Sequence, residues 1–289
     1  MSVTPVLAPR RRRRASDATN WPITALAVFV AAVFMLPALW LFSGSLRPTS
    51  EIFGSLYPLS WGVIVPKTVS VDNYTALFAG TFGRAFLVSL TVCLLTVAIG
   101  LVVCVTAAYA LAVLEFPGRG AAFAFVVISF MVPFEAIAIP LSQLFNSWGL
   151  TNTLMGLVLP GIGNGLAIFN LRQFFRSVPA SYREAAKVDG ASEPRVLFGM
   201  YVPLSGPAIV NSALLIFLGQ WSSYLWPLIT VSDPKLQVAP IALAKTFTEH
   251  FADYGQNFAG AVALSVVPAV LMLVLQRTFG ALGISSGEK

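Results

Sequence analysis

The stretch AFLVSLTVCLLTVAIGLVVCVTAAYALAVL, residues 85–114, runs for 30 residues without an Asp, Glu, Lys or Arg. As an α-helix it would be about 45 Å long, which exceeds the roughly 30 Å hydrocarbon core of a bilayer. A helix of that length crosses a membrane with a tilt or protrudes from it. The stretch therefore predicts a transmembrane helix.

Similar charge-free stretches recur along the chain. They cover residues 18–46, 196–232 and 254–276, and residues 120–171 contain a single charge, Glu135. Charged residues make up 10% of the 289 residues and hydrophobic residues 57%, whereas a soluble domain carries about 25% charged residues. A globule so poor in charge could not cover its surface, which excludes a soluble enzyme, a disulfide scaffold and a disordered chain. We expect an all-α polytopic membrane protein.

Six transmembrane helices are expected, within a membrane domain over residues 21–285. Their predicted ranges are 22–42, 86–114, 121–145, 154–174, 207–229 and 259–275. A basic tail at 1–20 precedes the domain, a short tail at 286–289 follows it, and a polar loop over 176–206 separates the fourth and fifth helices.

Basic residues determine the expected orientation, because Lys and Arg accumulate in cytoplasmic loops. With the N-terminus inside, thirteen basic residues lie on the inner side and five on the outer side. The thirteen are Arg10 to Arg14, Arg119, Arg172, Arg176, Arg183, Lys187, Arg195, Arg277 and Lys289. Both termini are therefore predicted to be cytoplasmic.

The remaining composition argues against other classes of site. The net charge of +6 and pI near 9.6 do not indicate nucleic-acid binding, because the basic residues sort by membrane side rather than onto one face. Cys93 and Cys104 are eleven residues apart, about 16 Å along a helix, too far for a disulfide. His250 is the one histidine, which cannot form a metal cluster alone. We expect no metal site and no catalytic residue.

The polar loop over 176–206 predicts a short helix at the membrane surface. Ser181 and Glu184 have the spacing of a capping box, so the helix is expected to begin at Tyr182. Gly190 stands where a left-handed residue would end it. Ala residues between these ends favour the helix and leave room for a partner backbone.

A second short helix is expected directly after the first. Ser192 can cap it, Pro194 is tolerated in its first turn, and Pro203 ends or kinks it before the fifth transmembrane helix. The product is a helix–turn–helix with small and charged residues on its surface. Two interpretations stay open on these physics: a surface that docks into a partner, or a solvated amphipathic loop.

The spacing of this loop resembles a known family. Glu184, Ala185 and Ala186 are followed by three residues, Gly190, nine residues, and an apolar run that closes on Pro203. The pattern is similar to that of permease subunits of binding-protein-dependent ABC importers. Met200 and Val202 replace the family's Ile and Leu, and both keep apolar character.

The resemblance extends over residues 20–285 and is closest to the carbohydrate-uptake branch, the relatives of the maltose permease G subunit. The short matching segments are Ser45-Leu46-Arg47-Pro48, Glu51-Ile52-Phe53, Asn73-Tyr74, Tyr109-Ala110-Leu111, Phe116-Pro117-Gly118-Arg119 and Trp226-Pro227-Leu228-Ile229. The family implies a six-helix type I importer permease in the bacterial plasma membrane, which forms half of the translocation pathway for a sugar or sugar-like solute.

The resemblance also implies roles in the loop. The helix from Glu184 to Gly190 would be the coupling helix, docked into a separate ATP-hydrolysing subunit. The implied coupling residues are Glu184, Ala185, Ala186, Asp189, Gly190 and Pro203. The sequence contains no Gly-x-x-x-x-Gly-Lys-Ser/Thr loop, so ATP and Mg²⁺ are expected in the partner. Implied partners are a second homologous permease, two ABC ATPase subunits and an extracytoplasmic solute-binding protein.

Polar residues inside the predicted spans are candidates for the substrate pathway, because polar groups in lipid are costly. Amides can bind sugar hydroxyls and an indole can stack on a sugar ring. The candidates are Glu135, Asn164, Asn170, Asn211, Gln220 and Trp221. Helix–helix hydrogen bonding explains such amides equally well. Several interpretations of Glu135 stay open: it lines the pathway, it pairs with a group on a partner permease, or it is either a buried neutral acid with a local hydrogen bond or a residue near a helix end. Trp221 and Trp226 also fit an interfacial aromatic belt, which is the preferred interpretation of Trp226.

Two outer segments, 44–83 and 231–258, are expected to receive the solute-binding protein. The alternative function is an ion-gradient-driven secondary transporter of small polar solutes. That class expects internal repeats and several buried ionisable groups, whereas Glu135 stands alone here. A non-transporting membrane scaffold would not need the coupling loop.

Overall fold

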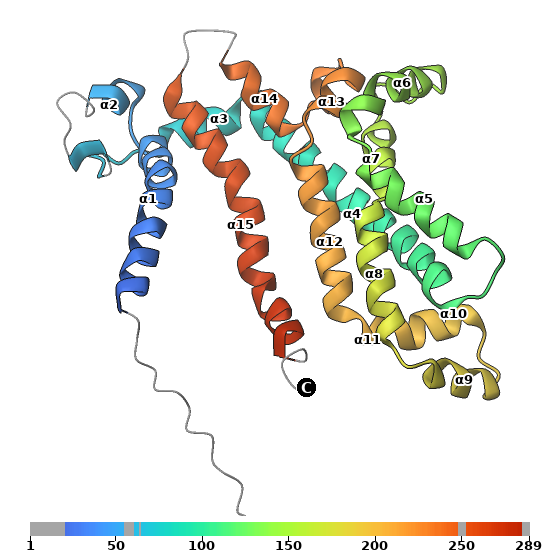
Figure 1. The fold of residues 1–289 in the computed structure, drawn as a ribbon. Coiled ribbons are helices and arrows are strands. Elements are labelled where there is room, and N and C mark those ends of the chain that lie inside the picture. The colour runs from blue at the N-terminus through green and yellow to red at the C-terminus, as the bar shows by residue number, and fades with distance from the viewer. Residues whose placement is uncertain (1–20, 55–60, 64, 248–252, 285–289) are drawn as a thin grey trace, which may run out of the picture.

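A computed structural model of the chain describes residues 21–54, 61–63, 65–247 and 253–284, the last eight as backbone only. Every regular element in these ranges is helical (Figure 1). The tails predicted at 1–20 and 286–289, and His250, lie outside the described residues. The elements are α1 (Trp21–Ser45), α2 (Thr49–Gly54), η1 (Trp61–Val63), α3 (Asp72–Ala79), α4 (Thr81–Val113), α5 (Arg119–Met131), α6 (Phe134–Ser147), α7 (Leu154–Ile162), α8 (Gly165–Ser177), α9 (Ala180–Val188), α10 (Glu193–Val196), η2 (Leu197–Tyr201), α11 (Val202–Leu204), α12 (Gly206–Trp221), α13 (Leu225–Thr230), η3 (Pro234–Leu236), α14 (Ala239–Thr246) and α15 (Tyr254–Ile284).

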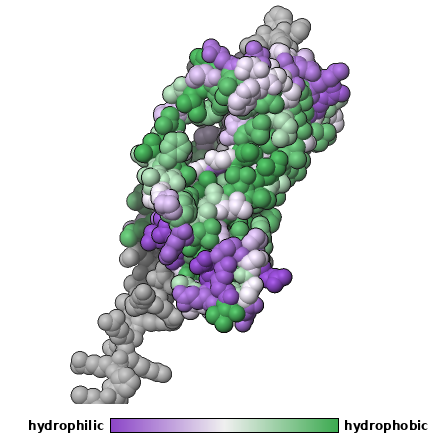
Figure 2. Space-filling view, turned by 90° about the vertical axis from the view of Figure 1, so that its right-hand side faces the viewer, coloured by the Kyte–Doolittle hydropathy of each residue, from purple (hydrophilic) through white to green (hydrophobic). Residues whose placement is uncertain are grey.

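Three helices are long and apolar enough to cross a membrane by themselves: α1, α4 and the Tyr254–Gln276 part of α15. Three bent pairs of helices also qualify if each pair is one span, which gives up to six candidates among the described residues. The pairs are Arg119–Met131 with Phe134–Ser147, Leu154–Ile162 with Gly165–Ser177, and Glu193–Leu204 with Gly206–Trp221. Figure 2 shows an apolar surface between two polar ends, as a bilayer requires. The all-helical membrane fold predicted from the sequence is confirmed.

The helix predicted over 121–145 is instead two helices. The axes of α5 and α6 differ by 99°, so α6 lies across the end of the bundle (Figure 1). Val132, between them, is extended with φ −73° and ψ 123°. The cause is Pro133, which lacks an N–H and disfavours helical geometry in the residue before it.

Two further predicted helices are interrupted. The segment 154–174 contains a 41° bend between α7 and α8, where Asn164 caps α8 by accepting a 2.9 Å hydrogen bond from the Ala167 N–H. The segment 207–229 breaks between Trp221 and Leu225. Pro227 accounts for this second break, because its ring would clash with the carbonyl four residues earlier.

The centre of the bundle forms around α4, which packs against α7, α8 and α12. Small residues bring the backbones together, as is common between membrane helices. A Cβ added to Gly100 of α4 would lie 3.3 Å from the Ile162 backbone, so a larger residue would separate the two helices. Asn170 of α8 donates a 2.8 Å hydrogen bond to Ser212 Oγ of α12, which adds a polar tie between helices.

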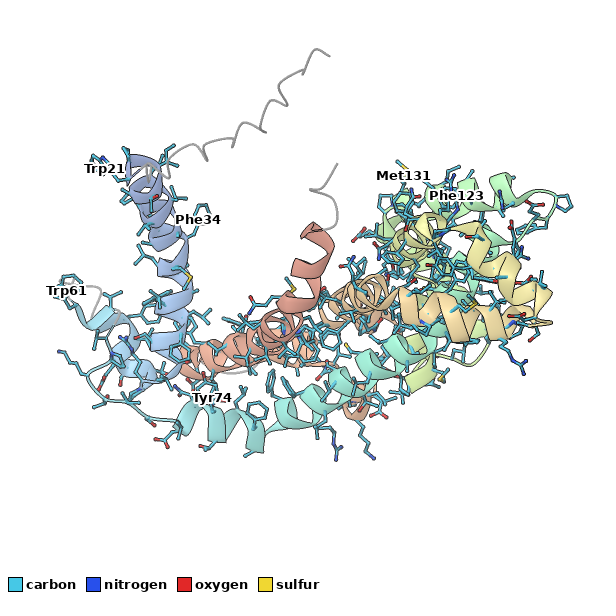
Figure 3. All side chains as sticks on the ribbon, turned by 90° about the horizontal axis from the view of Figure 1, so that it is seen from below. Trp21, Phe34, Trp61, Tyr74, Phe123 and Met131 are labelled. Atoms are coloured by element: carbon cyan, nitrogen blue, oxygen red, sulfur yellow. The ribbon has the colours of Figure 1, made fainter. Side chains whose placement is uncertain are left out.

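The first helix stands apart from this centre. It packs mainly against α15 and contacts η1, and the side chains of Trp21 and Phe34 are 74% and 80% exposed. Figure 3 shows both side chains on the part of α1 that extends away from the bundle. In a membrane such a face meets lipid or another protein.

A buried guanidinium joins α1 to the segment that follows it. Arg47 is 2% exposed and donates hydrogen bonds to the carbonyls of Gly62, at 2.6 Å, and Val63, at 3.1 Å. It also donates to the Ser43 carbonyl at 3.2 Å and to the Ser43 hydroxyl. Asn73 adds hydrogen bonds of 2.9 and 2.8 Å to the carbonyls of Ser45 and Arg47. This hydrogen-bond network around Arg47 and Asn73 fixes η1 and α3 to the end of α1.

Replacing Arg47 tests how much this hydrogen-bond network contributes to stability. We expect Arg47→Met to lower the free energy of unfolding by about 2–3 kcal/mol, because charged hydrogen bonds are lost and buried carbonyls are left without donors. Thermal unfolding of the detergent-solubilised protein measures this. The control is Arg84→Met, which removes an exposed arginine of α4 and should change stability by no more than about 0.5 kcal/mol. Equal melting temperatures for both variants would contradict the prediction.

Candidate functional site

The loop after α8 forms the predicted helix–turn–helix, but the first helix begins differently. α9 starts at Ala180 rather than Tyr182, Pro179 occupies the N-cap position, and no side chain caps the helix. Ser181 lies within the first turn, so it cannot adopt the extended geometry that a capping box needs. The predicted Ser181–Glu184 capping box is therefore wrong.

The end of α9 is as predicted. Gly190 has φ +79°, a left-handed conformation that glycine adopts without steric cost. The Gly190 N–H bonds to the Lys187 carbonyl at 3.0 Å, and the Ala191 N–H bonds to the Ala186 carbonyl at 2.9 Å. These two bonds form a Schellman motif, which reverses the chain into α10.

The second helix follows directly. Ser192 is the N-cap of α10 and Pro194 lies in its first turn, although the Ser192 side chain makes no capping hydrogen bond. The chain continues through the π-helical turn η2 and α11 and then bends by 88° into α12. The bend follows Pro203 by two residues, at the buried Ser205. The predicted interruption near Pro203 is confirmed.

Most of α9 faces outward. None of its residues is buried; Glu184, Ala185 and Asp189 are exposed, and the Val188 side chain is 89% exposed. Ala186 is half-buried against the α4–α8 core. The helix thus presents a carboxylate, a small residue and an apolar tip at one end of the molecule (Figure 1).

Sequence reasoning missed a charged cluster behind α9. Glu193, in the first turn of α10, accepts hydrogen bonds from Arg183 Nη2 at 2.5 Å and from the Tyr109 hydroxyl of α4 at 2.5 Å. Lys187 Nζ lies 3.0 Å from the same carboxylate. The available signal was Arg183 and Lys187 one helical turn apart, followed by an acid after the turn. The link to Tyr109 spans 84 residues and has no local signal.

The charge state of Glu193 follows from these donors. The hydrogen bond from Arg183, with smaller contributions from Tyr109 and Lys187, outweighs partial burial and lowers the pKa of Glu193 to about 2. A depressed carboxyl pKa contributes stability that is complete above the unfolded value of about 4.3 and is lost as pH falls toward the folded value. Glu193 is therefore a carboxylate at neutral pH.

A cavity of about 430 Å³ with a mixed polar and apolar lining lies at the opposite end of the bundle, between α6, α7, α12 and α13. The three helix breaks described above all reach it, and its polar lining comes from residues at or beside them. These residues are Glu135, Asn164, Gln220, Ser222, Ser223 and Tyr224. Because the breaks free backbone groups from helical hydrogen bonds, the cavity is the place where such groups can meet water or a polar solute.

Three of the six predicted pathway residues line this cavity: Glu135, Asn164 and Gln220. Gln220 also donates a 3.3 Å hydrogen bond to the Leu157 carbonyl. Sequence reasoning did not select Ser223 or Tyr224, because a serine and a tyrosine in an apolar segment carry no distinguishing pattern.

The other three predicted residues lie away from the cavity lining. Asn170 joins α8 to α12, and the Trp221 indole donates a 3.0 Å hydrogen bond to the Leu264 carbonyl of α15. Asn211 is half-buried on α12. The predicted interfacial position of Trp226 is wrong: it is 2% exposed and donates a 2.9 Å hydrogen bond to the Gly156 carbonyl, because α13 folds back onto α7.

The sequence is similar to those of known transport proteins. Residues 100–282 match the family described as binding-protein-dependent transport system inner membrane component. The chain is 31% identical over 278 residues to the arabinooligosaccharides transport system permease protein AraQ of Halalkalibacterium halodurans, across 96% of this chain and 98% of that protein. It is 35% identical over 278 residues to the trehalose transport system permease protein SugB of Mycobacterium tuberculosis, across 94% and 98%.

A solved structure shares the fold. It is the crystal structure of a bacterial ABC transporter involved in the import of the acidic polysaccharide alginate. The TM-score is 0.78 at 21% identity, over 95% of this chain and 99% of that chain. The arrangement of helices described above is thus one that an experimental structure also contains.

Cysteine labelling tests whether the cavity is open to water. We expect Ser223→Cys, on the cavity wall, to react with a small polar thiol reagent in membranes, because a reactive thiol must be reachable from water. The native Cys93 and Cys104 are 1% and 0% exposed and should not react. The control Ser212→Cys is at a fully buried position of α12 and should stay unlabelled. Equal labelling of Ser223→Cys and Ser212→Cys would contradict the assignment.

Proposed function

Since this chain belongs to the binding-protein-dependent transport system inner membrane components and is the non-catalytic permease subunit of an ABC importer, we propose that its solute is a sugar or sugar-like molecule. The chain would form half of the translocation pathway in a bacterial plasma membrane. The relatives that support this are the arabinooligosaccharide and trehalose permeases. The polar lining of the cavity is consistent with a hydroxyl-rich solute.

The pathway is assigned to the cavity at the helix breaks. Glu135, Gln220 and Tyr224 offer hydrogen-bonding groups there, and its volume of about 430 Å³ lies within the usual range for small-molecule sites. In this assignment Asn164 acts mainly through its backbone turn, because its side chain already caps α8. Asn170, Asn211 and Trp221 serve helix packing.

The coupling function is assigned to α9. The observation that carries it is the exposed surface of Glu184, Ala185 and Val188 on a helix with no buried residue. Glu184 would pair with a basic group of an ATPase subunit, and Ala185 would allow close approach of its backbone. The Schellman turn at Gly190 ends this surface sharply, so the docked segment is short.

ATP and Mg²⁺ are assigned to the partner ATPase, because this sequence has no phosphate-binding loop. Two such subunits would act with two permeases and an extracytoplasmic solute-binding protein. A second permease subunit would complete the proposed half of the pathway, and the exposed apolar face of α1 would meet that subunit or lipid. The end of the bundle that carries α2, α3 and α14 (Figure 1) is where the binding protein would sit.

The proposed orientation has both termini in the cytoplasm. The start of α1, the end of α15 and the α9 loop lie at the same end of the molecule (Figure 1). Arg183, Lys187 and Arg195 belong to that end, as the positive-inside rule expects for a cytoplasmic face.

Uptake by the reconstituted complex tests the energy source. Proteoliposomes that contain the complex purified through this chain, with ATP inside and the binding protein outside, should accumulate labelled trehalose or arabinooligosaccharide. We expect vanadate to abolish uptake and a protonophore to leave it unchanged, because hydrolysis rather than an ion gradient supplies the work. Uptake that stops with the protonophore and continues with vanadate would favour a secondary transporter.

A charge reversal tests the docking surface. We expect Glu184→Lys to reduce ATP hydrolysis stimulated by the binding protein at least about fivefold, the lower range of coupling between sites. The matched control is Glu115→Lys, which reverses an exposed carboxylate on the loop before α5 and should keep normal stimulation. Normal stimulation in Glu184→Lys would remove α9 as the coupling helix.

A further inference from the structure

We propose that Glu193 is a positioning residue that holds α9 at a fixed orientation to α4, so that a force on α9 moves the transmembrane bundle. The inference rests on the proposed coupling function and adds Glu193, which occupies one of the nine unspecified positions of the motif that suggested that function. The juxtaposition that carries it is one carboxylate in contact with α9, α10 and α4.

Few other contacts determine the orientation of α9. The helix buries none of its own residues, and within it the half-buried Ala186 makes the apolar contact with the core. Val178 just before the helix and Ala191 just after the turn pack against the same core. These three side chains bury little apolar area, so apolar packing constrains the orientation of the nine-residue helix only weakly. The two cations that reach Glu193, Arg183 and Lys187, lie on one face of α9 a turn apart. They hold that face against the first turn of α10.

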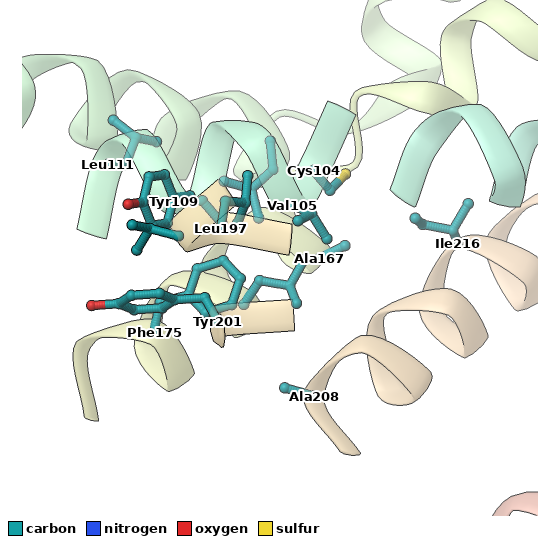
Figure 4. Packing of buried hydrophobic residues seen from close by; sticks show 14 residues of the cluster. Cys104, Val105, Tyr109, Leu111, Ala167, Phe175, Leu197, Tyr201, Ala208 and Ile216 are labelled. Atoms are coloured by element: carbon teal, nitrogen blue, oxygen red, sulfur yellow. The ribbon is translucent and has the colours of Figure 1, made fainter. Parts of the chain in front are cut away.

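The third contact connects this pair of helices to the membrane. The Tyr109 hydroxyl donates to Glu193, while its ring is 3% exposed within the core. The ring makes edge-to-face contacts with Tyr201 of η2, at 5.2 Å, and Phe175 of α8, at 6.4 Å between centroids. Figure 4 shows the three rings packed together. A displacement of Glu193 would therefore be transmitted through Tyr109 to α4, to α8 and to the turn that leads to α12.

The route continues to the cavity. α4 packs along α7 and α12, and these two helices supply Gly161 and Gln220 to the cavity wall. A Cβ on Gly161 would lie 2.6 Å from Gln220 Oε1 and 2.7 Å from Thr96 Cγ2 of α4. Because α4 packs this closely against α7 at Gly161, a shift of α4 toward α7 would displace the cavity wall.

The negative charge of Glu193 is what allows its carboxylate to bind the three donors Arg183, Lys187 and Tyr109 together. An ionised carboxylate accepts several hydrogen bonds at once, and its bonds to cations are about twice as strong as neutral ones. An amide at position 193 would retain one acceptor oxygen and would turn a donor group toward Arg183 or Lys187. Tyr109→Phe removes the hydroxyl alone and keeps the ring packing, so it separates the link to α4 from the link to α9.

The test uses the whole importer in proteoliposomes and measures how much labelled trehalose or arabinooligosaccharide is imported per ATP hydrolysed. It also measures how much ATPase co-purifies with each variant. We expect Glu193→Gln and Tyr109→Phe to retain the ATPase and its basal hydrolysis, while import per ATP falls at least about fivefold. Glu193→Asp should restore part of the ratio, because it keeps the charge on a shorter side chain. The control Arg195→Gln, an exposed cation of α10, should match the wild type.

The outcomes separate the two proposals. A wild-type ratio of import to hydrolysis in both Glu193→Gln and Tyr109→Phe would overturn the positioning role and leave the docking role of α9 intact. Loss of the ATPase from Tyr109→Phe would also overturn it, since the cluster would then only hold the docking surface. Absence of a co-purifying ATPase from the wild type itself would instead remove the proposed coupling function. Thermal unfolding of each variant identifies one that fails to fold.

Discussion

A helix that crosses hydrocarbon must pair its backbone N–H and C=O groups internally, and this constraint decides where the present chain can bend. Three of its breaks, at Pro133, at Gly163–Asn164 and at residues 222–224, meet at one cavity, where protein and water can satisfy the freed groups. The fourth, the bend at Ser205, lies next to the polar α9–α10 loop. The three interruptions at the cavity thus line the space to which we assign the solute pathway.

At the other end of the bundle, charged side chains rather than helix breaks define the candidate site. There, α9 is too short and too exposed to be positioned by apolar packing, and the carboxylate of Glu193 connects it to α10 and α4. The two ends share helices: α4 carries Tyr109 at one end and packs along α7 and α12, which form part of the cavity wall. The mechanical link that we propose between α9 and the cavity therefore runs through the long central helix α4.

Local composition was enough to predict much of this protein. Stretches free of charge identify membrane helices, because insertion depends on the summed hydrophobicity of a segment and needs no knowledge of its neighbours. The same holds for the polar loop at 176–206, where Gly190 and Pro203 mark turns through their own backbone properties. Pro133 and the Gly163–Asn164 pair carry similar signals, yet each lies inside a range predicted as a single span, since hydropathy does not register a bend.

Only the tertiary structure decided which polar residues meet. Glu135, Asn164 and Gln220 come from three predicted helices and line one cavity, whereas Asn170 and Trp221, of the same polar character, are used in packing. The contact between Tyr109 and Glu193 joins residues 84 positions apart. Partition into a membrane is a property of each segment alone, so the sequence determined it. The pairing of side chains depends on how the segments rotate and pack against one another, and that follows from all of them together.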